Sequence, residues 1–179
     1  DGAYACPLSS VVSLGDELHY LEVEPSGTRV RTRPYRGEVG VLDLSSEFRS
    51  KGKLQSAVVK SNTQYFDVGG RGPVTLPIGE YRLFSGVVSA QPQLAHLKQG
   101  EMKPFEVKAG KTLTLEWGNP VSIAFAHEYR GGIVTISPEK THVLGESGEE
   151  YFAFKPMAFT PTVVVRDMRA DSVVQKGTM

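Results

Sequence analysis

Two stretches of alternating residues decide the fold, residues 76–83, LPIGEYRL, and residues 105–115, FEVKAGKTLTL. In each stretch apolar and polar side chains alternate with a period of two, which is the pattern of a half-buried β-strand. The second stretch pivots at Ala109-Gly110, a pair that suits a tight turn between two strands. The sequence therefore predicts β-strands joined by tight turns.

The distribution of glycine and proline predicts short strands along the whole chain. The 179 residues include 19 glycines and 11 prolines, spread between short apolar runs rather than gathered in one linker. This spacing favours many short strands, with at most one helical turn, at 45–48. The predicted strands are 17–24, 28–34, 38–44, 54–60, 64–68, 80–88, 103–108, 111–117, 121–127, 132–137, 150–154, 162–166 and 172–176.

The number of predicted strands bears on domain organisation. Thirteen strands are too many for a single seven-stranded sandwich, so we expect an all-β protein of two tandem Ig-like or prealbumin-like β-sandwich modules. The polar segment 89–100 breaks the alternation on both sides and is the best internal boundary. It separates an N-terminal β-sandwich module, 1–100, from a C-terminal Ig-like module, 101–179. A single larger β-sandwich is the alternative.

Alternation also predicts which side chains are buried. The apolar set of strand 111–117 is Leu113, Leu115 and Trp117, and the set of strand 121–127 is Val121, Ile123 and Phe125. Each set lies on one face of its strand, and residues 118–120, GNP, suit the reversal between the strands. We expect these two faces to share one core.

Charge, hydropathy and cysteine content exclude several classes of partner and site. Lysine plus arginine number 20, as do aspartate plus glutamate, so no net field attracts nucleic acid or an acidic membrane surface. No apolar run approaches the ~20 residues of a membrane helix, so no membrane span is expected. The single cysteine, Cys6, excludes an internal disulfide and a thiolate zinc cluster. We expect an intermolecular disulfide or an inert thiol, with lipidation as the alternative.

Residues 76–83 and 107–115 resemble the penultimate and last strands of bacterial surface β-sandwich modules. These are the carboxypeptidase-regulatory-like (prealbumin-like) and PEGA types, relatives in architecture of Ig-like domains. The shared pattern is Leu-Pro-x-Gly-x-Tyr-x-Leu, followed by Val-x-Ala-Gly-x-Thr-x-Thr-Leu. Residues 161–177 likewise resemble the last hairpin of an Ig-like module. The resemblance implies a non-catalytic extracellular module used for spacing, adhesion, assembly or ligand display.

Motifs that carry chemistry do not emerge from the sequence. Residues 110–112, GKT, end like a phosphate-binding loop, but the first glycine of that motif would fall on Phe105. The four histidines share no metal-binding spacing. The only acidic cluster is Glu146, Glu149 and Glu150, for which we expect a solvated loop, with a calcium site as the alternative. We therefore expect no catalytic residue, no metal and no cofactor.

Aromatic side chains are the remaining candidates for ligand binding, because sugar-binding sandwiches present flat rings to pyranose faces. The candidates are Tyr35, Tyr65, Tyr129 and Tyr151, together with His127 at a predicted strand end. These residues are scattered, so the leading hypothesis is a non-enzymatic module, secreted or at the cell surface, that forms part of a bacterial surface assembly, fibre or adhesin. Its exposed edge strands would pair with protein partners or with further copies.

Two further hypotheses remain open. The first is a carbohydrate-binding module of a secreted protein, with a polysaccharide as its partner. It predicts two or more exposed rings on one face. The second is a hydrolase with a dispersed Ser/His/Asp site, which predicts a histidine within hydrogen-bond reach of a carboxylate and a serine.

Overall fold

A computed structural model describes residues 9–62, 64–155 and 162–178, and these residues form β-strands and turns without a helix. The strands are β1 (Val11–Leu14), β2 (Glu17–Val23), β3 (Val30–Pro34), β4 (Val39–Asp43), β5 (Phe48–Arg49), β6 (Lys53–Ser61), β7 (Gln64–Asp67), β8 (Val74–Pro77), β9 (Gly79–Ala90), β10 (Gln93–Lys98), β11 (Phe105–Val107), β12 (Thr112–Thr114), β13 (Trp117–Gly118), β14 (Ser122–Arg130), β15 (Ile133–Leu144), β16 (Glu150–Lys155), β17 (Thr162–Asp167) and β18 (Ser172–Thr178). Each of the thirteen predicted ranges holds a strand, which confirms the all-β prediction.

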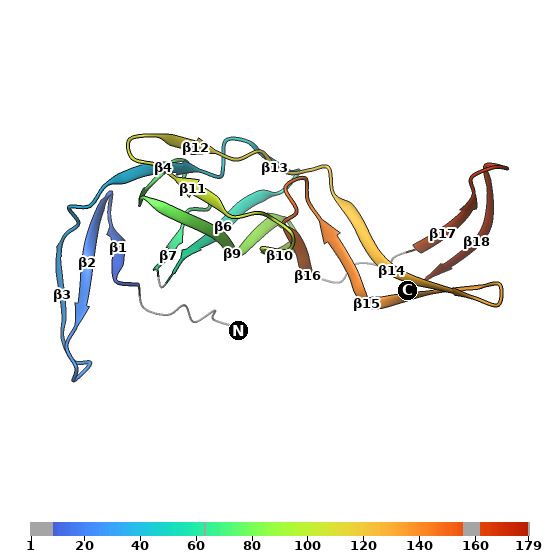
Figure 1. Cartoon of the computed structure of the whole chain (residues 1–179), viewed down its shortest axis with the longest axis horizontal. Coiled ribbons are helices and arrows are strands. Elements are labelled where there is room, and N and C mark those ends of the chain that lie inside the picture. The colour runs from blue at the N-terminus through green and yellow to red at the C-terminus, as the bar shows by residue number, and fades with distance from the viewer. Residues whose placement is uncertain (1–8, 63, 156–161, 179) are drawn as a thin grey trace.

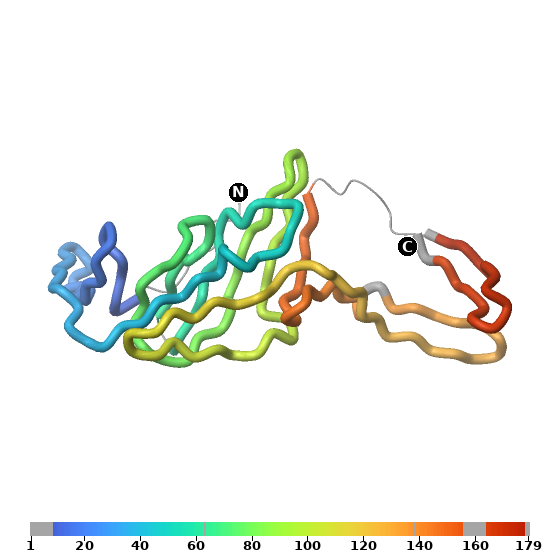
Figure 2. The backbone as a smooth tube through the Cα atoms, turned by 90° about the horizontal axis from the view of Figure 1, so that it is seen from above, coloured from blue at the N-terminus to red at the C-terminus, as the bar shows by residue number. Residues whose placement is uncertain are grey.

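The strands form one large sheet and several small ones. The large sheet runs β14-β15-β16-β10-β9-β6-β7, with β11 paired to the start of β9 (Figure 1). A second layer contains β12-β4-β8, and the pair β13-β5 continues it. The β1-β2-β3 sheet adjoins the large sheet, since β1 contacts β7 and Val11 of β1 is part of the hydrophobic core, whereas β17-β18 pairs with no other described strand. The molecule is elongated, with β1–β3 at one end and the hairpins β14–β15 and β17–β18 at the other (Figure 2).

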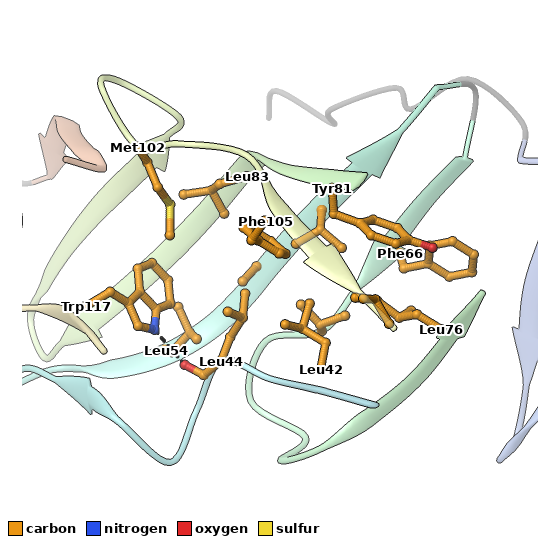
Figure 3. Packing of buried hydrophobic residues seen from close by; sticks show 14 of the residues in the cluster. Leu42, Leu44, Leu54, Phe66, Leu76, Tyr81, Leu83, Met102, Phe105 and Trp117 are labelled. Atoms are coloured by element: carbon orange, nitrogen blue, oxygen red, sulfur yellow. Dashed lines mark hydrogen bonds between the residues drawn. The ribbon is translucent and has the colours of Figure 1, made fainter. Parts of the chain in front are cut away.

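The core lies between the large sheet and the second layer. Figure 3 shows Leu42 and Leu76, from the second layer, packed toward Tyr81 and Phe105 of the large sheet. Trp117 has no exposed surface, and its indole N–H donates a 2.7 Å hydrogen bond to the carbonyl of Leu44. This satisfied donor lets the ring be buried at no polar cost. The prediction that Trp117 is a core residue is confirmed.

Strands from both sides of residue 100 share the large sheet. The segment 89–100, predicted to be a boundary, completes β9, turns at 91–92 and forms β10. Strand β10 pairs with β9 on one side and with β16 on the other. Phe105 and Trp117 pack in the same core as Leu42. The residues on the two sides of this segment are thus joined by hydrogen-bonded pairing and by one hydrophobic core.

The turn at 109–110 differs in its connections from the sequence prediction. Gly110 adopts the left-handed region at φ 61°, and the N–H of Lys111 donates to the carbonyl of Lys108 at 3.1 Å, so the tight turn is confirmed. The strands that it joins do not pair with each other, because β11 pairs with β9 and β12 runs parallel to β4. The turn carries the chain from one layer of the sandwich to the other.

The one helical turn allowed at 45–48 is a single hydrogen-bonded turn and not a helix. Asp43 accepts hydrogen bonds from the backbone N–H groups of Ser45 and Ser46 at 2.9 and 3.0 Å. The N–H of Phe48 then donates to the carbonyl of Ser45 at 3.4 Å, and β5 begins at Phe48. The carboxylate of Asp43 thus holds a single turn between β4 and β5.

Among the described residues no helix is long and apolar enough to cross a membrane.

Candidate functional site

The β14–β15 hairpin exposes an apolar face. All nine residues of β14 are exposed. Cross-strand pairing puts Ile123 opposite Val143 and Tyr129 opposite Val134, so side chains of these two strands line up on one side of the ribbon. This apolar hairpin face consists of Ile123, Phe125, His127 and Tyr129 on β14, and of Val134, Ile136, Thr141 and Val143 on β15. Ile123 is 62% exposed and Tyr129 is 73% exposed.

This exposure corrects the prediction that strands 111–117 and 121–127 share a core. Trp117 is fully buried, whereas Val121, Ile123 and Phe125 remain 48%, 62% and 49% exposed. The chain leaves the sandwich at Gly118. Its φ of 101° is a backbone conformation that residues with a side chain rarely adopt. Strand β14 then pairs with β15 at the edge of the large sheet, beyond the part of that sheet that the second layer covers. The alternating pattern was identified correctly, but no other sheet of the described chain covers the apolar side chains.

Strand β14 is also the edge of the large sheet. Its only partner among the described strands is β15, so the other side of its backbone has unpaired N–H and C=O groups. Strand β15 in turn pairs with β16 at Val143 and Leu144, near its own end. Most of the hairpin therefore projects beyond the sandwich, as Figure 2 shows. Long unpaired edges are where sheets in general can accept a further strand.

A buried carboxylate holds the base of the hairpin. The side chain of Glu149 has no exposed surface. It accepts hydrogen bonds from the N–H of Gly118 at 2.8 Å and from the N–H of Ser147 at 3.2 Å, and the hydroxyl of Tyr151 lies 3.5 Å away. Burial raises the pKa of Glu149, and these hydrogen bonds only partly oppose the rise. No basic side chain in the described part of the chain forms an ion pair with it.

Two ion clusters flank this base, one exposed and one centred on the buried carboxylate of Glu150. The guanidinium of Arg49 bridges Glu116 at 2.7 Å and Glu146 at 3.2 Å. On the other side, Glu150 contacts Lys98 at 3.1 Å and His142 at 2.9 Å. Burial by itself would raise the pKa of Glu150, but the hydrogen bonds and charges of the two basic groups outweigh burial and lower the pKa.

The solvated loop predicted for the acidic cluster is wrong for two of its members. Glu149 is 0% exposed and Glu150 is 9% exposed, whereas the side chain of Glu146 is 37% exposed. The three carboxylates have separate partners rather than a common centre. Within the described residues, no three His, Cys, Asp or Glu side chains are placed to hold a metal ion.

The β17–β18 hairpin is a second exposed ribbon at the same end of the molecule (Figure 1). Its two strands pair with each other and with no other described strand. Its exposed apolar side chains are Val164, Val165, Met168, Val173 and Val174. The end of the molecule away from β1–β3 therefore carries two ribbons with uncovered apolar groups.

The five predicted ligand-binding residues fall into three places. Tyr129 and His127 lie on the apolar hairpin face, where the ring of His127 is 6.0 Å from that of Phe125. Tyr151 lies in β16, half-buried beside Glu149. Tyr35 packs on Tyr20 with ring centroids 4.9 Å apart, and Tyr65 packs against Phe84 at 5.1 Å. The five do not form one platform.

Sequence reasoning missed the contribution of Ile123 and Phe125 to this surface. Their alternation is the same as that of core residues, so the pattern by itself cannot separate a buried face from an uncovered one. Residues 118–120, GNP, could have indicated this exposure, because a strand that follows a change of chain direction need not pack on the same core as the strand before it. Cys6 lies outside the described residues.

Comparison of the chain with protein-family models, with curated proteins and with solved structures gave no match. The resemblance to surface β-sandwich modules therefore stays a prediction.

Proposed function

We propose that the protein is a non-enzymatic structural or interaction module, secreted or at the cell surface, that forms part of a bacterial surface assembly. Its partner is a second copy of the same chain, and the contact is made through β14. The observation that carries this proposal is the apolar hairpin face on an unpaired edge strand. Sheet growth by addition of a strand would satisfy the free backbone groups and cover apolar side chains at the same time.

The total surface of the chain supports an associated state. Its accessible surface is 12247 Å² at a mass of 19.5 kDa, whereas a compact monomer of that mass exposes about 8,500 Å². An extended chain exposes roughly 160 Å² per residue, so the sixteen residues that the structure does not describe account for at most about 2,600 Å² of the difference. Roughly 1,100 Å² of excess surface remains, and a standard interface buries about 800 Å² per partner.

Self-complementarity of β14 supports a second copy as the partner. In an antiparallel pair of two β14 strands centred on Ala126, Ile123 lies opposite Tyr129 of the other copy and Phe125 lies opposite His127. All nine positions are then paired, and the apolar hairpin face continues across the junction. Glu128 falls opposite an alanine and Arg130 opposite a serine, so no like charges meet. The pairing is isologous, as in most closed dimers.

The strand pairing of the part that carries the hairpins bears on whether the chain forms one sandwich or two. Tandem Ig-like modules, 1–100 and 101–179, and a single larger sandwich are both compatible with an all-β chain. The pairing of β10 with both β9 and β16, and the shared core, support a single larger sandwich. A rigid single body would present the two hairpins from one end in a fixed direction.

Cysteine cross-linking combined with light scattering tests the pairing. In a Cys6→Ser background, Ala126→Cys places one thiol at the centre of the proposed pair, where the Cα atoms of opposed residues lie about 4.5–5.5 Å apart, within disulfide range. We expect a dimer by size-exclusion light scattering and a rapid covalent dimer on oxidation. Thr135→Cys, which is also exposed but lies on the inner strand β15, is the control and should cross-link slowly.

Two results would contradict the proposal. A monomer at every protein concentration would remove self-association as the function. A dimer in which Thr135→Cys cross-links as fast as Ala126→Cys would show that β14 is not the contact strand. Repeating the scattering measurement on the unaltered chain with and without reductant separates any contribution of Cys6.

A further inference from the structure

A groove of about 900 Å³ lies on the large sheet, away from the apolar hairpin face. Its lining comes mainly from β6, β9 and the end of β10, together with Tyr35 and single residues of β7 and β8. Lys60, Arg82 and Lys98 are its cationic side chains, one on each of the three neighbouring strands. The groove uses no residue of β14 or β15, so its function is independent of the assembly proposed above.

Two of these cations are placed directly against each other. Lys60 of β6 lies opposite Arg82 of β9 in the antiparallel register, so their side chains project from the same face of the sheet. Like charges at opposed positions destabilise a strand pair. In the described part of the chain, no carboxylate lies within ion-pair distance of Lys60, whose Nζ lies 5.6 Å from the centre of the Tyr65 ring. An anion between the two cations would relieve this repulsion.

The acidic groups near the groove leave its cations accessible. Glu80 contacts Arg82 at 3.4 Å, but both side chains are more than half exposed, so this pair is held only loosely. Lys98 is bound to Glu150 at 3.1 Å at the far end of the groove, and its side chain is 47% exposed. The three cations therefore outnumber the one acidic residue in the lining, Glu80.

Polar and aromatic groups complement the charges. The amides of Asn62 and Gln64 line the groove and can donate and accept hydrogen bonds with hydroxyl groups, and Gln99 lines it too, although its Nε2 already donates to the carbonyl of Met102 at 3.1 Å. Phe84, which is 38% exposed, gives the floor an apolar surface, held by the edge-on ring of Tyr65. Hydroxyls, an apolar ring face and regularly spaced negative charges occur together in acidic sugar chains.

We propose that this groove binds an acidic polysaccharide. Lys60 and Arg82 together take one carboxylate or sulfate group, and Lys98 takes another further along the chain. Leu97, the residue before Lys98, lies opposite Gly86, which is four residues beyond Arg82 on β9, or roughly 13 Å along the strand. The ligand therefore carries charges at intervals, and a small monovalent anion would engage only one end of the groove.

Titration with defined polymers tests the groove. The probes are polygalacturonate and dextran sulfate, with uncharged dextran and polyglutamate as comparisons, each measured by calorimetry on the full chain at low and at moderate salt. We expect binding to an acidic polysaccharide that weakens as salt rises. The double variant Lys60→Gln/Arg82→Gln should bind at least about ten-fold more weakly. The melting temperature of this variant should be no lower than that of the unaltered protein, because the repulsion between Lys60 and Arg82 is removed.

The control is Arg29→Gln/Lys111→Gln, which removes the same charge at exposed positions outside the groove and should leave the affinity unchanged. The proposal is overturned by failure to bind either acidic polysaccharide, by equal loss of affinity in the control, or by equally tight binding of dextran. Tighter binding of polyglutamate with the same dependence on Lys60 and Arg82 would overturn the polysaccharide and identify an acidic peptide instead.

Discussion

The backbone N–H of Gly118 donates a 2.8 Å hydrogen bond to the carboxylate of Glu149, and this bond joins the chain that enters the exposed hairpin to the chain that returns from it. The carbonyl of Gly118 accepts a second bond, 2.9 Å long, from the N–H of Glu146. Gly118 is thus tied through both of its backbone groups to the returning segment. The direction of the hairpin is set at this base, because little of the hairpin itself is packed.

Removing the carboxylate should loosen this base. Glu149→Ala leaves the N–H groups of Gly118 and Ser147 without their acceptor in a buried position. We expect the free energy of unfolding to fall by about 2–4 kcal/mol, measured by urea unfolding. The control is Glu146→Ala, an exposed partner of Arg49, which should cost less than about 1 kcal/mol. Equal losses in the two variants would contradict the role given to Glu149.

The raised pKa of Glu149 predicts a pH dependence of definite sign. In the folded protein this carboxyl takes up a proton at a higher pH than in the unfolded chain, whose value is near 4.5. Its contribution to stability is therefore fully present below pH 4.5 and is lost as the pH rises through the folded-state pKa. Compared with Glu149→Gln, the unaltered protein should gain stability as the pH falls from neutral towards 4.5.

Urea unfolding of both proteins across this pH range measures the difference. Glu150, with its lowered pKa, contributes in the opposite direction: its stabilisation is present above pH 4.5 and is lost as the pH falls through its folded-state pKa. Because Glu150 is unchanged in both proteins, its contribution largely cancels in the comparison. Parallel stability curves, or a relative loss of stability on acidification, would contradict the prediction.

Two glycines in left-handed regions should respond differently to alanine. Gly118 has a φ of 101°, and a Cβ there would meet the carbonyl oxygen of Arg49. Gly110 has a φ of 61°, and a Cβ there would meet nothing within 4 Å. Gly118→Ala should lower the free energy of unfolding by about 3 kcal/mol or more, and Gly110→Ala by about 1–2 kcal/mol. A urea-unfolding comparison that gave equal losses would show that the close approach at Gly118 is relieved by movement of the base.

The sequence predicted local structure well and long-range pairing poorly. The alternation around Trp117 correctly indicated its burial, and each predicted range contains a strand, although range 111–117 is divided between β12 and β13. The partners of the strands were not predictable, because the same alternation at 105–115 fits a hairpin as well as the observed crossing between layers. The buried carboxylate of Glu149 was missed, since its partners are backbone groups distant in sequence.

A charge on the apolar hairpin face should separate association from folding. Phe125→Glu places a carboxylate opposite His127 of the second copy in the proposed pair, while the side chain that it replaces is already 49% exposed. We expect a monomer by light scattering. At low protein concentration the stability should stay within about 0.5 kcal/mol of the unaltered chain. The unfolding midpoint should also lose its dependence on protein concentration, because association no longer contributes.

The matched control is Ile133→Glu on the opposite face of the same hairpin. Ile133 is 67% exposed and lies opposite Arg130, so the new carboxylate gains a favourable neighbour and adds the same charge to the chain. This variant should still associate. If both variants associate, the apolar hairpin face is not the contact surface. If both dissociate, added negative charge on the hairpin rather than the loss of Phe125 explains the effect.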